Sequence, residues 1–300
     1  ALEMGFLSDR IFFTFAWYRN RSSNQLVGIP LPGTTGFSFI NANLNATVQN
    51  MGLEFTLRTL NFESSNFKWT TNFNISASHN KLLSFPGLEG STYSNRYVIG
   101  ESTSIVKTYQ LNGVNPQTGL YEVEDINKDG MITSLEDKKN IEDLTPKYFG
   151  GLENQFQYKN WHLDFLFQFV KQQNYDYNPS VPGGSFFNQH SDMANAWQQA
   201  GDQVPFQMNT SGENGDAVNA YYNYLDSNSS IVDASFIRLK NIAVSYDLPL
   251  QAIKGVHCKL SLLGQNILTF TPYKGGDPEF KYTAYLPPLR IITAGVQLTF

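Results

Sequence analysis

The chain has 300 residues, enough for one large core or two ordinary ones, and its single cysteine, Cys258, excludes a framework of intrachain disulfide bonds. Its net charge is −5 and it has no basic stripe, which excludes nucleic acid as a partner, because binding to phosphates requires clustered Lys and Arg. Charged residues make up only 16% of the chain and aromatic residues 14%, so aromatic and uncharged polar side chains must cover much of the surface.

The first ten residues, ALEMGFLSDR, contain no basic segment followed by an apolar one, so we expect no signal peptide in this stretch. A run of about 18 apolar residues, which a transmembrane helix needs, is also missing from the sequence. This excludes a membrane-spanning helix but leaves a membrane barrel open, because barrel strands alternate and give only weak hydropathy.

Alternation of apolar and polar residues is the dominant pattern along the chain and predicts strands with two different faces. Residues 161–169, WHLDFLFQF, place Trp161, Leu163, Phe165 and Phe167 on one face, and the final segment alternates in the same way up to Phe300. Many of these segments exceed the 5 or 6 residues usual for soluble sheets, and about 9 to 11 tilted residues cross a bilayer. The predicted strands cover residues 2–8, 10–27, 39–62, 66–85, 148–159, 161–174, 231–247, 256–270 and 290–300.

The connections between these strands alternate in length, which places all short links on one rim and all long links on the other. This arrangement is typical of an outer-membrane barrel with short periplasmic turns and long extracellular loops, and it puts Phe300 on the periplasmic side. We expect one domain with inserted loops, since glycines and prolines gather mostly in the long links. The long loops are predicted at residues 28–38, 86–147, 175–230 and 271–289.

Two predicted strands change phase in the middle. Val48 and Leu53 have opposite parity although both are apolar, and so do Leu239 and Ile242. A β-bulge at each place would return the apolar side chains to one face.

Residues 125–137, DINKDGMITSLED, have the spacing of an EF-hand calcium loop, with Gly130 at the sharp turn. The alternative is a solvated acidic turn. The flanking segments TGLYEVE and DKKNIEDLTP leave no room for two long helices, so we expect a structural Ca²⁺ that orders a long loop and not a sensor. The predicted ligands are Asp125, Asn127, Asp129, Met131 through its carbonyl, Thr133 through water, and Glu136.

Several stretches, in order, resemble the C-terminal part of SusC/RagA-family TonB-dependent outer-membrane transporters. The residues that carry the resemblance are VQNMGLEFTLRTL, FKWTTNFNISASHNKLLSF, YQLNGVNPQTGLYEVEDINKDGMIT, TPKYFGGLENQFQYKNWHLDFLFQF, ASFIRLKNIAVSYDLP, LLGQNILTFTPYKGGDPE and GVQLTF. They span nearly the whole chain.

This resemblance implies an all-β protein, namely the C-terminal portion of a transmembrane antiparallel β-barrel, with about nine of the roughly 22 strands of such transporters. It implies that the plug domain, the signal peptide and the segment that contacts TonB are absent from this chain. It further implies import of glycan or peptide fragments across the outer membrane, driven through TonB, with a SusD-like surface lipoprotein as partner. No enzymatic activity is expected.

Other candidate sites have simpler explanations. Asp277 and Glu279 in GGDPEF could lie about 7 Å apart, a separation that glycosidases use, but Pro278 and the glycines favour a structural loop. A third reading, a barrel-bound enzyme, would depend on these two carboxylates. The four histidines share no metal-binding spacing with one another or with Cys258.

The loop of residues 175–230 is rich in aromatic and amide side chains, which suits either a substrate or partner surface or packing of the loop on itself. Its aromatic residues include Tyr177, Phe186, Phe187, Trp197, Phe206, Tyr221, Tyr222 and Tyr224. Near strand ends, an interfacial aromatic girdle is expected at Tyr158, Trp161, Tyr246 and Phe270, with ordinary sheet packing as the alternative.

The rival to a transporter is a secreted, soluble, calcium-stabilised all-β binding module. In that protein the apolar faces of two stacked sheets would meet across a dry interior, whereas in a transporter the apolar face would meet lipid.

Overall fold

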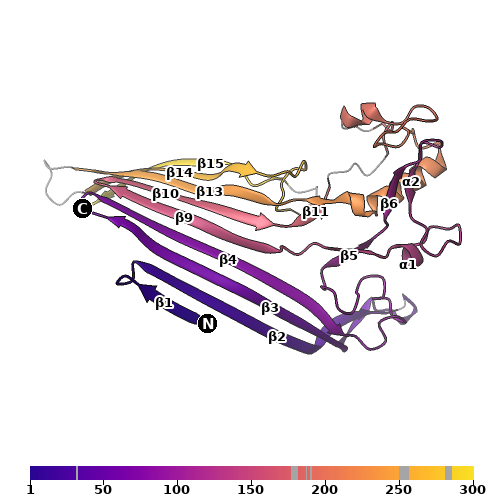
Figure 1. The fold of residues 1–300 in the computed structure, drawn as a ribbon, viewed down its shortest axis with the longest axis horizontal. Coiled ribbons are helices and arrows are strands. Elements are labelled where there is room, and N and C mark those ends of the chain that lie inside the picture. The colour runs from indigo at the N-terminus through magenta and orange to yellow at the C-terminus, as the bar shows by residue number, and fades with distance from the viewer. Residues whose placement is uncertain (32, 177–181, 187, 190, 250–256, 281–285) are drawn as a thin grey trace.

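Nine long antiparallel strands form a single sheet, which we call the wall, in the computed structural model of the chain (Figure 1). The structure describes residues 1–300 except residues 32, 177–181, 187, 190, 250–256 and 281–285. Neighbours in the sheet follow chain order, β1-β2-β3-β4-β9-β10-β13-β14-β15, and leave β1 and β15 as the two edges. The strands are β1 (Leu2–Phe6), β2 (Ile11–Pro30), β3 (Phe39–Glu63), β4 (Phe67–Ser84), β9 (Tyr148–Tyr158), β10 (Trp161–Lys171), β13 (Phe236–Leu248), β14 (His257–Phe270) and β15 (Ile291–Thr299).

All nine segments predicted from the alternation form strands of the wall, with two corrections at one place. Residues 231–235 do not belong to β13 and residues 172–174 do not belong to β10, because β12 (Ile231–Asp233) pairs with β11 (Gln173–Tyr175) in a separate two-stranded ladder. The wall breaks at this point because the Ser235 hydroxyl accepts from the Gln172 backbone N–H at 3.2 Å, where a sheet would use a backbone carbonyl.

The two rims of the wall differ as the connection lengths predict (Figure 1). Short turns join β1 to β2, β3 to β4 and β9 to β10 at one rim, and the chain ends on that side. The turn after β1 is tight, with Leu7, Ser8 and Asp9 all at positive φ. The long connections and all the small helices gather beyond the opposite rim, which we call the loop rim.

The alternation gives the wall an apolar face and a polar face. On the apolar face, a row of rings from β1, β2, β3, β4 and β10 runs across the sheet and passes over Gly150 of β9, with each centroid 5.9–6.4 Å from the next. The row consists of Phe6, Phe13, Phe55, Phe73 and Phe169. The opposite face carries side chains such as Arg58, Asn72, Gln155 and Asp164.

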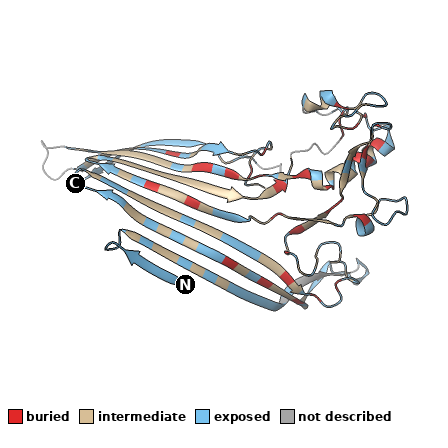
Figure 2. Ribbon diagram, viewed as in Figure 1, coloured by how far each residue is buried: buried red, intermediate tan, exposed pale blue. Residues whose placement is uncertain are grey.

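The apolar face is uncovered. Trp17 is 57% exposed, Leu262 52% and Val296 69%, and exposed residues recur along every strand of the wall except β10, where only Trp161 is exposed (Figure 2). The remaining sheets among the described residues have two strands each, and none is large enough to cover nine. The described residues therefore do not form the stacked pair of sheets that a soluble sandwich requires.

The predicted bulge in β13 is confirmed, because its pairing with β10 shifts between Leu239 and Asn241 and leaves Lys240 as the extra residue. The pairing with β14 also shifts there, but on that side β14 has two residues opposite Lys240. The bulge predicted between Val48 and Leu53 is wrong, since β3 pairs with β2 and β4 without interruption there. Val48 lies on the polar face and packs against Leu82 and Phe85 where the chain after β4 covers it. The phase changes because the other face of β3 is buried near the loop rim; the register of β3 against β4 does shift, but between Thr47 and Val48 and not between Val48 and Leu53.

The loops form their own small structure. Tyr121, Ala220 and Tyr221 are the centre of a hydrophobic cluster that joins two long loops. No helix among the described residues has the length and apolar character to cross a membrane. The elements of this region are β5 (Ile105–Thr108) with β8 (Asn140–Asp143), β6 (Leu111–Val114) with β7 (Tyr121–Val123), α1 (Ser134–Asp137), α2 (Gly215–Leu225), and the 3₁₀ turns η1 (Gly33–Thr35), η2 (Ser191–Asn195) and η3 (Asn228–Ser230).

Candidate functional site

The predicted calcium loop folds around the carboxylate of Asp125. Its Oδ1 accepts from the backbone N–H of Lys128 at 2.7 Å and its Oδ2 from that of Gly130 at 2.8 Å. Gly130 has φ +85°, a conformation that favours glycine, which explains the residue at this point of the turn. The side chain in the first position thus closes the loop into a ring.

Three of the predicted ligands converge. The Asn127 Nδ2 lies 2.9 Å from an oxygen of Asp129 and 3.0 Å from an oxygen of Glu136, so both carboxylates point at one place. A 180° rotation of the Asn127 amide would bring its Oδ1 to the same place as a third oxygen, at the cost of the hydrogen bond that this Oδ1 now accepts from the Asp129 backbone N–H at 3.2 Å. These residues fit Ca²⁺ provided that this amide turns.

The other predicted ligands lie beside this point or serve elsewhere. The Thr133 hydroxyl accepts from the Glu136 backbone N–H at 3.3 Å and caps α1. Met131 is 63% exposed and would contribute only its carbonyl. Across the described residues, no three His, Cys, Asp or Glu side chains stand together as a ready metal site, so calcium binding stays a prediction.

Asp137 is a structural residue of this loop that the spacing did not predict. Its carboxylate is fully buried and accepts from the backbone N–H of Ile126 at 2.9 Å and of Thr133 at 2.7 Å. The hydrogen bond from Thr133 holds the pKa of Asp137 below its ordinary value, with a smaller contribution from Ile126, while burial acts in the opposite direction. Asp137 therefore joins the two ends of the loop without a metal. The signal available in the sequence was a second acidic residue directly after Glu136.

The calcium loop is tied to the next long loop through α1. Lys138 lies 2.7 Å from the Asp226 carboxylate at the end of α2, and its ammonium lies 4.9 Å from the centre of the Tyr109 ring. The Tyr109 backbone N–H donates to the Asp226 carbonyl at 3.0 Å. Direct contacts thus connect residues 125–137 to the end of α2, so a change that orders the calcium loop should also order α2.

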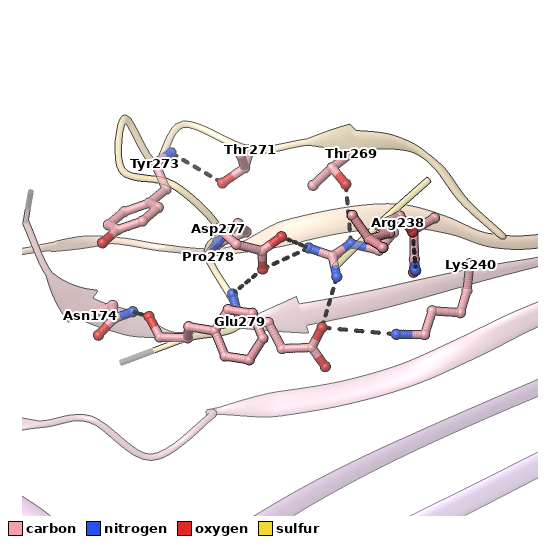
Figure 3. Close-up of polar contacts among 12 residues, drawn as sticks. Asn174, Arg238, Lys240, Thr269, Thr271, Tyr273, Asp277, Pro278 and Glu279 are labelled. Atoms are coloured by element: carbon pink, nitrogen blue, oxygen red, sulfur yellow. Dashed lines mark hydrogen bonds and ion pairs between the residues drawn. The ribbon is translucent and has the colours of Figure 1, made fainter. Parts of the chain in front are cut away.

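The two carboxylates of GGDPEF have a structural role, as predicted. Arg238 on β13 is only 1% exposed and donates to Asp277 through Nη2, at 2.7 and 2.9 Å, and to Glu279 through Nη1 at 2.8 Å (Figure 3). Its Nε donates to the Thr269 hydroxyl at 3.1 Å. All three nitrogens of the guanidinium are therefore engaged, and the arrangement clamps the loop after β14 onto the wall.

Most of the aromatic residues of the 175–230 loop that the structure describes pack on the loops themselves. Tyr121 and Tyr224 stack with ring centres 4.3 Å apart, and burial raises the pKa of Tyr121 and Tyr221 well above the ordinary range. The Trp197 Nε1 donates to the Pro116 carbonyl at 3.0 Å. Among these aromatics, Tyr222 and Phe186 are 50% and 90% exposed, whereas Tyr177 and Phe187 lie outside the described residues.

Three of the four predicted girdle residues form one cluster at the short-turn rim. Trp161 is the register partner of both Tyr158 and Tyr246, and its ring centre lies 4.6 Å from that of Tyr246. Phe270 lies at the other end of its strand and is 59% exposed. The two ends of the wall therefore both carry exposed rings on the apolar face.

Sequence comparison agrees with the family resemblance stated above. The chain is 28% identical to TonB-dependent receptor P3 of Formosa agariphila over 94% of this chain and 30% of the receptor. It is 24% identical to TonB-dependent receptor SusC of Bacteroides thetaiotaomicron over 93% of this chain and 29% of SusC. No protein-family model matches the chain. The chain thus spans about a third of the length of the curated relatives it matches.

Structural comparison supports the same conclusion for the fold. A solved structure of the RagAB peptide transporter matches 99% of this chain and 34% of its own, with a TM-score of 0.81 and 20% identity. The RagAB peptide importer in its open-open state matches with a TM-score of 0.76 and 19% identity. In sequence and in fold, the chain is therefore similar to a section of the TonB-dependent receptors. Within that class, the chain resembles the SusC/RagA transporters, as the sequence motifs predict.

Proposed function

We propose that the chain forms about nine strands of the roughly 22-stranded barrel of an outer-membrane, TonB-dependent importer of glycan or peptide fragments. One observation carries the proposal: the apolar face of a nine-stranded sheet is uncovered while its opposite face is polar. If water met both faces, the row of rings and its apolar neighbours would be exposed to water. A barrel in a membrane avoids this, because lipid meets the apolar face and the water-filled lumen meets the polar face.

The orientation in the membrane follows from the rims. Outer-membrane barrels have short periplasmic turns and long extracellular loops. The short turns and the chain end at Phe300 are therefore periplasmic, and α1, α2 and the calcium loop are extracellular. The aromatic cluster around Trp161 would mark the inner lipid interface.

The proposed partners follow from the relatives. A SusD-like lipoprotein would cover the extracellular loops, and TonB would act through a part of the protein on the N-terminal side of this chain. Support comes from the similarity to SusC and to the RagAB complex. The packed loops offer such a lipoprotein an ordered platform.

We further propose that Ca²⁺ binds at Asp125, Asn127, Asp129, Met131, Thr133 and Glu136 as a structural ion. The convergence of Asp129 and Glu136 on Asn127 supports this site. Since α1 has only four residues and β7 precedes the loop, the helix pair of a calcium sensor does not flank it.

Membrane fractionation and cysteine labelling test the proposal. In a Cys258→Ser background, Ser211→Cys places a thiol in the long loop before α2 and Ser65→Cys places one in the turn between β3 and β4; both serines are exposed. A membrane-impermeant maleimide should label the first variant on intact cells and the second only after lysis. The protein should be found with the outer membrane and require detergent for release.

Equal labelling of both variants, or release of the protein into buffer at high salt, would support the soluble calcium-stabilised module instead. The barrel-bound enzyme has little support, because Asp277 and Glu279 are bound to the buried Arg238.

A further inference from the structure

A hollow of about 540 Å³ opens on the polar face of the wall close to the loop rim. Its floor is apolar and consists of Phe149, Leu166, Val170 and Phe236. Gly151 lies among them, and a Cβ at this position would stand 3.3 Å from a methyl group of Leu166. Ligand pockets have volumes of roughly 300–1,000 Å³, so the hollow is large enough for one or two amino-acid side chains.

Amide groups surround this floor and keep hydrogen-bonding capacity for a ligand. Asn74 accepts from the Gly151 backbone N–H at 3.1 Å through Oδ1, and its Nδ2 has no acceptor within the described part of the chain. Gln172 donates to the Pro278 carbonyl at 2.5 Å through Nε2, which leaves its Oε1 as an acceptor. The hollow thus offers a hydrogen-bond donor and an acceptor beside an apolar surface. An extended peptide has the complementary groups, namely backbone C=O and N–H groups next to apolar side chains.

A charged pair marks one side of the hollow. The Lys240 ammonium lies 3.9 Å from Glu279 Oε2, too far for a hydrogen bond, and the two side chains are 36% and 37% exposed (Figure 3). The β13 bulge brings Lys240 to this position, and Arg238 fixes Glu279 from the opposite side at 2.8 Å. The contact of Lys240 with Glu279 is therefore weak, whereas Arg238 holds Glu279 in place without Lys240.

We propose that this hollow binds a short peptide with an apolar side chain on the floor and its free C-terminal carboxylate on Lys240, an inference that rests on the proposed importer function. A carboxylate bound to an ammonium ion makes a charge-assisted hydrogen bond, stronger than a neutral one. A glycan suits the hollow less well, because sugar rings stack on exposed aromatic faces, and here only Phe149, 45% exposed, offers one, whereas Phe236 is 3% exposed.

The test uses the full-length protein in detergent and three probes: a fluorescein-labelled Leu-Ser-Leu-Ser-Leu peptide with a free C-terminus, the same peptide with a C-terminal amide, and maltohexaose. Anisotropy measures peptide binding and calorimetry measures maltohexaose binding. Lys240→Met is compared with Lys68→Met, a matched loss of charge in a separate hollow of the polar face, where Lys68 pairs with Glu63 at 2.9 Å.

The wild type should bind the free-acid peptide about tenfold more tightly than the amide, and Lys240→Met should lose about that factor for the free acid only. Lys68→Met should change both affinities by less than about twofold. Gly151→Leu, which fills the hollow, should weaken both peptides.

Three results would overturn the inference: no peptide binding by the wild type, equal effects of Lys240→Met and Lys68→Met, or a larger effect of Lys240→Met on maltohexaose than on peptide. If the protein resides in the outer membrane and any of these is seen, the importer remains and only the peptide site is lost. Absence from the outer membrane would remove the importer itself.

Discussion

The wall and the loops of this chain hold together in different ways. Among the described residues, most of the buried hydrophobic side chains lie in the loops, and the wall contributes Ala46, Leu82, Phe236 and Leu239, all close to the loop rim. Over the rest of the wall, large apolar side chains are exposed. The loops fold around their own hydrophobic core, as a small water-soluble protein does. The wall has no such core, so its apolar face must be covered by an apolar medium such as lipid.

The polar contacts differ in the same way. The loop side of the molecule buries Arg238, Asp137 and Asn174 with several hydrogen bonds each, where every lost partner leaves a costly unpaired group. Away from the loop rim, ion pairs on the wall, such as Lys68 with Glu63, are exposed. The loops should therefore be sensitive to single polar substitutions, and the wall to charge on its apolar face.

Breaking the Arg238 clamp should have the largest effect. Arg238→Met leaves Asp277, whose side chain is 10% exposed, without its cation, and loss of one partner from a buried pair costs about 3–5 kcal/mol. Limited proteolysis should show early cleavage in the loop after β14. The matched control, Lys171→Met, removes an exposed pair with Asp233 at 2.7 Å and should cost about 1 kcal/mol or less. Similar costs for the two variants would contradict the distinction between buried and exposed pairs.

A charge on the apolar face should be the next largest effect. Leu262 and Leu263 are adjacent, 52% and 44% exposed, and lie on opposite faces in the middle of β14. Leu262→Arg should reduce the free energy of unfolding in lipid by about 2–4 kcal/mol, because arginine would enter hydrocarbon. Leu263→Arg faces water in the lumen and should be nearly neutral. Equal tolerance of both substitutions, measured by urea titration in vesicles, would show that lipid does not cover the apolar face.

Calcium should stabilise the loops and leave the wall unchanged. If the ion binds as proposed, Ca²⁺ at about 100 times its Kd should stabilise the bound segment by about 2.7 kcal/mol. Hydrogen exchange should slow in residues 125–137 and, through Lys138 and Asp226, at the end of α2. Asp125→Ala should abolish stoichiometric calcium binding in calorimetry. Slower exchange along β14, or calcium binding that survives Asp125→Ala, would speak against a loop-restricted ion.

Low pH should destabilise the same loop, by less than calcium stabilises it. The folded pKa of Asp137 lies below the ordinary value of 3.8, so its contribution is complete above that value and is lost as the pH falls through the lowered pKa. Hydrogen exchange of the Ile126 and Thr133 amides, measured without calcium, should rise below about pH 3.8. In Asp137→Asn this rise should be missing, because the side chain no longer titrates. A rise of the same size in both proteins would assign the effect to other groups.

The wall could be predicted from the sequence because a period of two and the length of the connections are local signals. The nine strands and the Lys240 bulge follow from them. The prediction of a bulge after Val48 was wrong because alternation shows only which side chains are buried. Near Val48 the segment after β4 covers the polar face, so an apolar residue is buried there without any bulge. That covering is a tertiary contact that no local pattern contains.

The candidate site was predictable to a different degree. The loop spacing identified Asp125, Asn127, Asp129 and Glu136, and the structure brings the last three together. Asp137 was missed because its partners are backbone N–H groups, whose positions depend on the folded loop. The Arg238 partners lie 39 and 41 residues away, beyond the reach of any motif.

The margins of the sheet have one more consequence. β1, with five residues, and β15, with nine, each have a neighbour on one side only, so their outer backbone donors and acceptors form two rows that no strand of the sheet pairs with. Such rows template the addition of a further strand from any chain that offers one. Expressed alone in water, this polypeptide should therefore polymerise edge to edge, and a soluble preparation of it would first need those two rows of backbone groups capped.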